Sequence, residues 1–367
     1  MAPREPGNKS KKSALSLSGG IDQPGPVNPD AINRLKKVKK SYSVPELLQG
    51  IRDRDITLLS RAITLIESAH PDHQADAQEL VAACLPLSGN SFRLGITGIP
   101  GAGKSTFIEA LGKHMIGKGS RLAVLAIDPS SDRSKGSILG DKTRMEELSG
   151  MAEAYIRPSP TGGTLGGVAR KTRETIILCE AAGFDTIFVE TVGVGQSETT
   201  VHGMVDFFLL ILLAGAGDEL QGIKRGIMEM ADAIVINKAD GNNIGRTRRA
   251  QAEFASVLHL SPPSPSGWVP QVKTCSSLYG TGIEEVWEMI GQYRQHVSES
   301  GYLTGRRQEQ SRYWLYETIR EGIFHQVLHS KDMQEMLEKY EEEIALGRIT
   351  SFRAAARILE KFRSVEK

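Results

Sequence analysis

The hydrophobic pattern of the chain is strand-like in its middle. Between residues 92 and 295, short β-branched apolar runs alternate with amphipathic stretches, and the runs lack regular polar positions. Such runs are typical of strands covered on both faces, so they predict an α/β fold with a mostly parallel sheet flanked by helices. The predicted strands are residues 93–97, 122–127, 186–190, 207–213, 233–236 and 269–274.

Both ends of the chain have helical periodicity instead. Apolar residues recur at helical spacing over residues 43–90, which predicts a helical N-terminal region before a nucleotide-binding domain at 91–298. Residues 299–367 also follow helical stripes, and we expect this region to pack on the sheet domain or to dimerise. The stripes are Trp314, Leu315, Ile319, Ile323 and Val327, and then Ile344, Phe352, Ala355, Ile358 and Leu359.

Composition and charge narrow the class of protein. Lys and Arg number 45 against 44 Asp and Glu, which fits neither a polybasic nucleic-acid binder nor an acidic disordered chain. Positive charge gathers in residues 1–42, which are rich in Gly, Pro and Ser and predict a disordered basic arm. The three cysteines suggest no disulfide framework, and no apolar run reaches the roughly 20 residues of a membrane span. We therefore expect a cytoplasmic protein without a membrane span.

A glycine-rich motif predicts a phosphate site. Residues 98–105 match Gly-x4-Gly-Lys-Ser between a predicted strand and a predicted helix, which is the context that the motif requires. Backbone N–H groups of such a loop converge on phosphates, while the lysine supplies a charge and the serine binds Mg²⁺. The residues concerned are Gly98, Ile99, Pro100, Gly101, Ala102, Gly103, Lys104 and Ser105.

Acidic residues follow two of the predicted strands. Asp128 and Glu190 are placed where open α/β sheets bind ligands, and Glu190 opens a Glu-x-x-Gly motif that resembles the Asp-x-x-Gly of switch GTPases. Glu190 would hold Mg²⁺ through water or orient the nucleophile, and Gly193 would offer its amide to the γ-phosphate. Asp141, in the loop at 136–145, is a third candidate. A helix cap or a turn is the alternative role for each carboxylate.

A second motif predicts which base is bound. Residues 237–240 read Asn-Lys-Ala-Asp directly after a strand, so Asp240 can accept hydrogen bonds from guanine N1–H and the 2-amino group. Lys238 would lie along the base, and Asn237 would connect this loop to the phosphate loop. GTP is favoured over ATP because adenine lacks both donors. A backbone N–H on guanine O6 is expected from the following loop, at Ser276, Ser277 and Leu278.

With these motifs in order, the chain resembles the MeaB/ArgK family of P-loop GTPases, which includes the human methylmalonic aciduria type A protein. The resemblance covers residues 44–364 and leaves out the basic arm. It depends on long runs that are more specific than the glycine-rich loop alone. These runs are residues 47–50, 61–67, 98–106, 128–131, 136–145, 190–198 and 215–224.

The resemblance implies a homodimeric GTPase that uses GTP, GDP and Mg²⁺ and chaperones an adenosylcobalamin-dependent acyl-CoA mutase of the methylmalonyl-CoA mutase type. It further implies that GTP binding and hydrolysis gate cofactor loading and protect the mutase. By position, the resemblance implies phosphate and metal binding for Lys104, Ser105 and Thr106. It places Asp128 and Asp141 in a first switch and Glu190 in a second. A third switch would contain Asp218, Gln221 and Lys224.

Two other functions are compatible with parts of the sequence. One is an ATPase or kinase linked to transport of basic amino acids (lysine, arginine or ornithine), against which Asp240 argues. The other is a metal-insertion GTPase, for which the best ligand pair is His325 and His329, four residues apart on a predicted helix. No residue obviously supplies an arginine finger, so we expect slow hydrolysis until a partner completes the site. Lys224 is the hypothesised mobile residue, with an exposed helix lysine as the alternative.

Overall fold

The computed structural model describes residues 42–68, 70–127, 145–158, 165–191, 197–215, 225–259, 262, 264–329 and 331–365. Internal contacts divide the chain into two units, residues 1–43 and residues 44–367, and the second unit contains the sheet and the helices. The predicted basic arm, apart from Tyr42, lies outside the described residues, and the predicted domain boundaries stay predictions.

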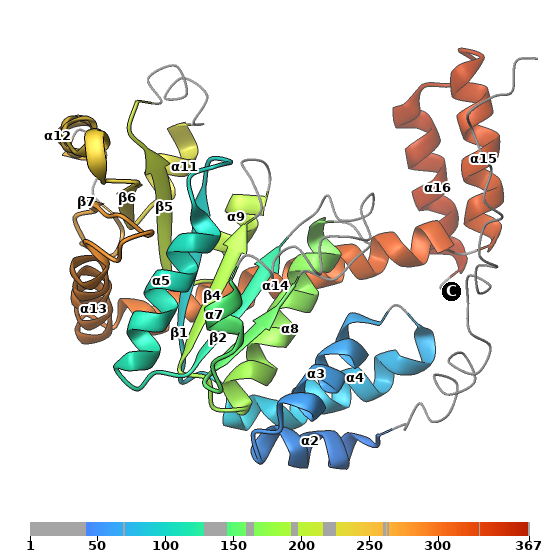
Figure 1. Cartoon of the computed structure of the whole chain (residues 1–367). Helices are drawn as coiled ribbons and strands as arrows, with labels where there is room; N and C mark the ends of the chain where they lie inside the picture. The colour runs from blue at the N-terminus through green and yellow to red at the C-terminus, as the bar shows by residue number, and fades with distance from the viewer. Residues whose placement is uncertain are drawn as a thin grey trace, which may run out of the picture. The chain divides into compact units, whose positions relative to one another are not determined.

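A seven-stranded sheet forms the centre of this unit, in the order β3-β2-β4-β1-β5-β6-β7 (Figure 1). Every neighbouring pair of strands runs parallel, and helices flank the sheet. The predicted α/β fold is therefore confirmed. The strands are β1 (Phe92–Gly98), β2 (Leu122–Ile127), β3 (Ala154–Arg157), β4 (Thr186–Thr191), β5 (Phe207–Leu213), β6 (Ala233–Asn237) and β7 (Gln271–Thr274).

The position of β1 determines where a ligand can bind. β1 lies between β4 and β5, and the chain crosses to β2 on one side before it returns to β5 on the other. Such a reversal of strand order leaves a crevice outside the carboxyl ends of the strands. The β1 to α5 connection, which carries the glycine-rich motif, opens at this crevice.

Three N-terminal helices, α2 (Val44–Arg52), α3 (Ile56–Glu67) and α4 (Pro71–Cys84), pack against one another and against α8 (Leu165–Ala181). The start of α3 is capped by Asp55, whose carboxylate accepts from the N–H groups of Thr57 and Leu58 at 2.7 and 3.1 Å. The other helices up to residue 299 are α5 (Lys104–Gly117), α7 (Glu146–Ser149), α9 (Ser197–His202), α11 (Arg225–Met230), α12 (Ile244–His259) and α13 (Ile283–Glu299), with 3-10 turns η1 (Leu85–Leu87) and η3 (Gly241–Asn243).

The C-terminal region consists of α14 (Tyr302–His329), α15 (Lys331–Ala345) and α16 (Ser351–Val365). The first part of α14 is bonded to the amino-terminal edge of the sheet. Arg307 donates to the carboxylate of Asp206 at 2.6 and 2.9 Å, and to the carbonyl oxygens of Gly89 and Ser91 at 2.6 Å each. Two further side chains of α14 donate to the loop before β5: Gln310 to Val205 and Trp314 to Gly203.

α15 and α16 form a hairpin with a small core of their own. Met333, Tyr340, Ala354 and Ile358 are buried in it. Phe352, by contrast, is 88% exposed. The two helices therefore bury one face against each other and leave apolar residues on another.

The structure differs from the sequence-based expectation chiefly in strands β3 and β7. Strand β3 was not predicted, because it is a four-residue edge strand that ends in Arg157 and offers no apolar run. Strand β7 begins two residues later than predicted. Of the predicted apolar stripe of α14, Trp314 is buried, while Leu315 and Ile319 are 57% and 49% exposed, so the alternatives of packing on the sheet or dimerising stay predictions for this stripe.

In the described part of the chain, no helix combines the length and apolar character that crossing a bilayer requires.

Candidate nucleotide site

The glycine-rich loop joins β1 to α5 in a conformation that other residues could not adopt. Gly98 has φ of 155°, and a Cβ there would lie 2.2 Å from the carbonyl oxygen of Ile211. Gly103 has φ of 85°, and a Cβ there would lie 2.7 Å from Nδ2 of Asn237. The loop therefore keeps its backbone close to neighbouring strands, with the amino terminus of α5 directly behind it, where backbone N–H groups favour an anion.

Lys104 lies over this loop. It is only 8% exposed, and its Nζ donates to the carbonyl oxygens of Gly98 at 2.9 Å and Ile99 at 3.4 Å. The ammonium group is thus held at the loop that is predicted to bind the phosphates. A fixed positive charge at this position can neutralise charge on the terminal phosphates of a nucleotide.

Two of the predicted metal ligands lie next to each other. The hydroxyl of Ser105 donates to Oε1 of Glu190 at 3.4 Å, and the Glu190 side chain is buried. The pairing of β1 with β4, in which Ile96 is opposite Glu190, brings them together. Thr191 Oγ1 also donates to Thr97 Oγ1 at 2.9 Å, a contact that was not predicted, although a threonine at each strand end was the available signal.

Asn237 connects the base loop to the phosphate loop, as the sequence predicted. Its Nδ2 donates to the carbonyl oxygen of Ala102 at 2.8 Å. Its Oδ1 accepts from the N–H and the hydroxyl of Ser277 at 3.1 and 2.8 Å, and from the thiol of Cys275 at 3.5 Å. Burial raises the pKa of Cys275 to about 12, so the thiol keeps the proton that it donates.

Asp240 is oriented by Ser276, which was predicted to belong to the loop that contacts guanine O6. The hydroxyl of Ser276 donates to Oδ2 of Asp240 at 2.5 Å, and Asp240 itself is half-buried. Lys238 is exposed and has φ of 59°, while Leu278 is 73% exposed. The pattern of the loop alone could not have told which of its two serines faces the carboxylate.

The remaining predicted residues are either exposed or outside the described part of the chain. Thr106 is exposed in the first turn of α5. The side chains of His325 and His329, although on α14, are not described, and no group of three or more His, Cys, Asp or Glu side chains that could hold a metal ion occurs among the described residues. The predicted residues outside the described ranges are Asp128, Asp141, Gly193, Asp218, Gln221 and Lys224.

A glycine loop between a central strand and a helix, a lysine over it, and a serine beside a strand-end carboxylate define a P-loop nucleoside triphosphatase. The particular family follows from comparison with known proteins. The family model described as "Methylmalonyl Co-A mutase-associated GTPase MeaB" matches residues 59–332. The chain belongs to this family and is a P-loop GTPase.

Known relatives are similar along most of the chain. A probable GTPase of Mycobacterium tuberculosis is 49% identical over 318 residues, which are 87% of this chain and 95% of that protein. The mitochondrial methylmalonic aciduria type A homolog of Mus musculus is 45% identical over 336 residues, 89% of this chain and 81% of that protein. A solved structure described as a LAO/AO transport system kinase is 37% identical with a TM-score of 0.70, and the match covers 89% of this chain and 100% of that one.

Proposed function

We propose that this GTPase is a chaperone of an adenosylcobalamin-dependent acyl-CoA mutase of the methylmalonyl-CoA mutase type. In this role GTP binding and hydrolysis gate the loading of the cofactor and protect the mutase. The observation that carries the proposal is the match of residues 59–332 to a family described by its association with methylmalonyl-CoA mutase. The mouse relative, named for methylmalonic aciduria, supports the same partner.

The described part of the site fits a magnesium ion. Ser105 and Glu190 offer a hydroxyl and a carboxylate within 3.4 Å of each other, and oxygen donors of this kind suit a hard cation. We assign metal binding to this pair together with Asp128 and Asp141. When bound, Mg²⁺ would neutralise charge on the β- and γ-phosphates. The chain's own contribution is to fix the phosphates with Lys104 and the loop amides.

Guanine selectivity is assigned to the Asp240 carboxylate. An oriented carboxylate can accept from two guanine donors, and its bond from Ser276 fixes one oxygen of that group. We further assign guanine O6 to a backbone N–H in residues 276–278. The bonds that join Asn237 to Ala102 and Ser277 support a base loop and a phosphate loop that hold one nucleotide together.

We also propose that the protein is a homodimer formed through its C-terminal helices. The apolar side chains that α14, α15 and α16 leave exposed support this assembly, because a large uncovered apolar surface is typical of an interface. These side chains include Leu315, Tyr316, Ile319, Ile323, Ile344, Phe352 and Leu359.

The mobile part of the mechanism is assigned to the switch residues. Gly193 would bind the γ-phosphate, and Gln221 and Lys224 would couple contact with the mutase to the nucleotide site. In this scheme Lys224 moves to the nucleotide when the mutase docks. Lys224→Ala would then lose the partner-stimulated part of GTP turnover and keep the basal part; unchanged stimulation would remove Lys224 from the mechanism.

The test of the proposed function is binding to candidate cobalamin mutases. The purified full chain would be mixed with each mutase in GDP and in a non-hydrolysable GTP analogue, and co-elution and GTP turnover would be measured. We expect one mutase to bind in a nucleotide-dependent way and to raise the rate of hydrolysis. Lys104→Met is the control for nucleotide dependence. If no cobalamin mutase binds or changes turnover, the chaperone function is wrong.

The transport-kinase function would give another product. The solved relative is described as a transport system kinase, and a kinase would leave the γ-phosphate on a protein or small-molecule acceptor rather than on water. We assign the preference for GTP over ATP to the Asp240 carboxylate, which the hydroxyl of Ser276 orients. GTP and ATP labelled at the γ-phosphate distinguish the two functions, since we expect label from GTP only in inorganic phosphate.

A cytoplasmic location stays a prediction.

A further inference from the structure

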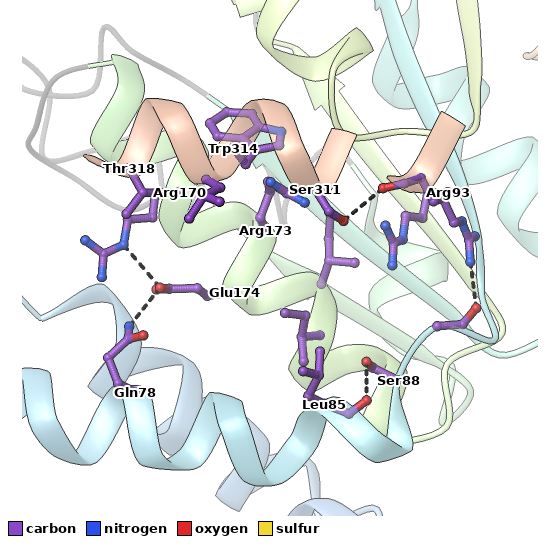
Figure 2. Close-up of a pocket in the computed structure, with 15 residues that line it drawn as sticks. Gln78, Leu85, Ser88, Arg93, Arg170, Arg173, Glu174, Ser311, Trp314 and Thr318 are labelled. Atoms are coloured by element: carbon purple, nitrogen blue, oxygen red, sulfur yellow. Dashed lines mark hydrogen bonds and ion pairs between the residues drawn. The ribbon is translucent and has the colours of Figure 1, made fainter. Parts of the chain in front are cut away.

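A cavity lies at the amino-terminal edge of the sheet, away from the phosphate loop. It has a volume of about 480 Å³ and is bounded by α4, α8, α14 and the start of β1 (Figure 2). This volume lies within the range of pockets that bind small molecules. Part of its wall is apolar, with Leu85, Ile177 and Trp314 among the lining residues.

The polar part of the wall is dominated by arginine. Four arginines line the cavity, and three of them have a carboxylate partner: Arg93 with Glu180 at 2.8 Å, Arg170 with Glu174 at 3.2 Å, and Arg307 with Asp206 at 2.6 Å. The Glu174 carboxylate also accepts a hydrogen bond of 2.9 Å from the side-chain amide of Gln78, on α4. The fourth arginine, Arg173, has no carboxylate partner among the described residues.

Arg173 is held in place by an aromatic ring. Its guanidinium lies 4.9 Å from the centre of the Trp314 ring of α14. Figure 2 shows Arg173, which comes from α8, between Arg170 and Arg93. Burial and then the charge of Arg93 lower the pKa of Arg173 to about 10. The group remains charged at neutral pH, in a partly dry wall beside another cation. Such a charge is stabilised when an anion supplies the missing counter-charge.

We propose that this cavity binds a small organic anion. Its phosphate or carboxylate group is held by Arg173, and its apolar body lies against Trp314 and Ile177. A guanidinium binds either oxyanion through two parallel N–H groups, which is why the two sources share one chemistry. The apolar wall adds burial energy that inorganic phosphate cannot use, so the body of the ligand contributes to its affinity.

Calorimetry with model ligands tests the proposal. The full chain would be saturated with GDP and Mg²⁺ and titrated with 1-naphthyl phosphate, 1-naphthoate, neutral 1-naphthol and inorganic phosphate. Tighter binding of naphthyl phosphate than of naphthol supports a phosphorylated ligand, and tighter binding of naphthoate supports a carboxylate. If naphthol binds as tightly as both anions, or if neither anion binds, the proposal is overturned.

Two arginine variants locate the binding. Arg173→Met keeps an unbranched apolar stem and removes the guanidinium, and we expect it to weaken the better anion by roughly 10- to 100-fold, the effect of losing a charge-assisted pair. Arg348→Met, at an exposed position between α15 and α16, is the matched control and should bind like the wild type. Equal affinity of Arg173→Met and wild type would exclude this cavity.

A second pair of variants does not depend on a buried substitution. Ser311 is exposed on α14 and lines the cavity, so Ser311→Glu introduces an anion beside the arginines without removing packed atoms. We expect Ser311→Glu to abolish binding of the anions. Ser311→Gln, whose side chain has the shape of glutamate without its charge, should keep that binding. Lys104→Met should leave this binding unchanged, which separates the cavity from the nucleotide site. Loss of binding in Lys104→Met but not in Ser311→Glu would assign the probes to the nucleotide site and contradict the proposal.

Discussion

The polar contacts at the amino-terminal ends of the strands, the amino-terminal edge of the sheet, differ from those at the carboxyl ends of the strands, its carboxyl-terminal edge. At the amino-terminal edge, the Asp206 side chain is fully buried and accepts from Arg307 and from the N–H of Arg93, with distances from 2.6 to 2.9 Å. At the carboxyl-terminal edge, Ser105 and Glu190 are joined by one long contact of 3.4 Å. Charge at the first edge is paired directly between Asp206 and Arg307, whereas Ser105 and Glu190 at the second edge belong to the site that is proposed to bind phosphate and metal.

This difference indicates what each edge contributes. Buried charge pairs that satisfy one another connect α14 to the sheet, so their loss affects the free energy of unfolding. Polar groups that are predicted to bind a ligand act on that ligand, so their loss is expected to affect binding and turnover. Substitutions at the two edges should therefore separate stability from activity.

The largest effect on stability is expected from Asp206→Ala. It removes the carboxylate and leaves the Arg307 guanidinium poorly compensated, which should lower the free energy of unfolding by about 3–5 kcal/mol. Urea unfolding measures this change. The control is Glu284→Ala, which breaks a surface pair with Lys118 whose side chains are 61% and 58% exposed, and it should cost less than about 1 kcal/mol. Equal losses in both variants would contradict the assigned role of the amino-terminal edge.

The largest effect on activity is expected from Lys104→Met. The phosphates lose a fixed cation, and GTP turnover should fall by about 10²- to 10³-fold, with a change in the free energy of unfolding below about 1 kcal/mol. Steady-state phosphate release and urea unfolding would be measured on the same samples. Lys113→Met, on the same helix but partly exposed, is the control and should keep turnover. A stability loss as large as that of Asp206→Ala would erase the distinction between the edges.

A smaller change is expected from Asp240→Asn. The amide cannot accept from both guanine donors, so GTP should bind roughly 10- to 100-fold more weakly. Xanthosine triphosphate, which has a carbonyl in place of the 2-amino group, should bind more tightly than it does to the wild type. Titration calorimetry with both nucleotides measures the exchange. Unaltered GTP affinity would exclude the base contact.

The smallest effect concerns pH at the amino-terminal edge. Burial, and then the charge of Arg306, lower the pKa of His202 to about 4, so the folded chain binds fewer protons here than the unfolded chain between about pH 4 and 6.5. Stability from this group is present above pH 6.5 and is lost as the pH falls through that window, by about 1–2 kcal/mol after solvent screening. Urea unfolding of His202→Gln should show a flatter dependence on pH.

Asp232 provides the control of opposite sign. Burial raises its pKa to about 6, so its charged form costs stability as the pH rises from about 4 to 6. Asp232→Asn, which keeps the acceptor for the N–H of Phe208, should remove that loss. If both variants shift the pH profile in the same direction, the assignment of these two groups is wrong.

Much of the fold could be predicted because its signals are local. Fully buried strands such as β2 and β5 are continuous apolar runs, and the glycine-rich motif marks the turn after β1. Strand β3 gave no such signal because it gains its stability from pairing with β2 at a sheet edge. The burial of Trp314 next to the exposed Leu315 also depends on a distant element, the loop before β5.

The site was predictable to the same extent. Spacing predicted the contact between Asn237 and the phosphate loop, because the motif fixes which loops meet. The role of Ser276 was not predictable, since two adjacent serines are equivalent in the sequence and only the path of the backbone selects the one that contacts Asp240. The arginine cavity gave no signal at all, because its four arginines come from three separate elements.

The contacts of Asn237 have a consequence for engineering the protein. One side-chain amide contacts both Ala102 and Ser277, so in the proposed site the loop assigned to the base and the loop assigned to the phosphates depend on the same residue. A laboratory attempt to recode this enzyme for another purine should therefore vary Asp240 together with Ser276, which orients it. It should leave Asn237 untouched, because we expect its replacement to disturb both loops at once.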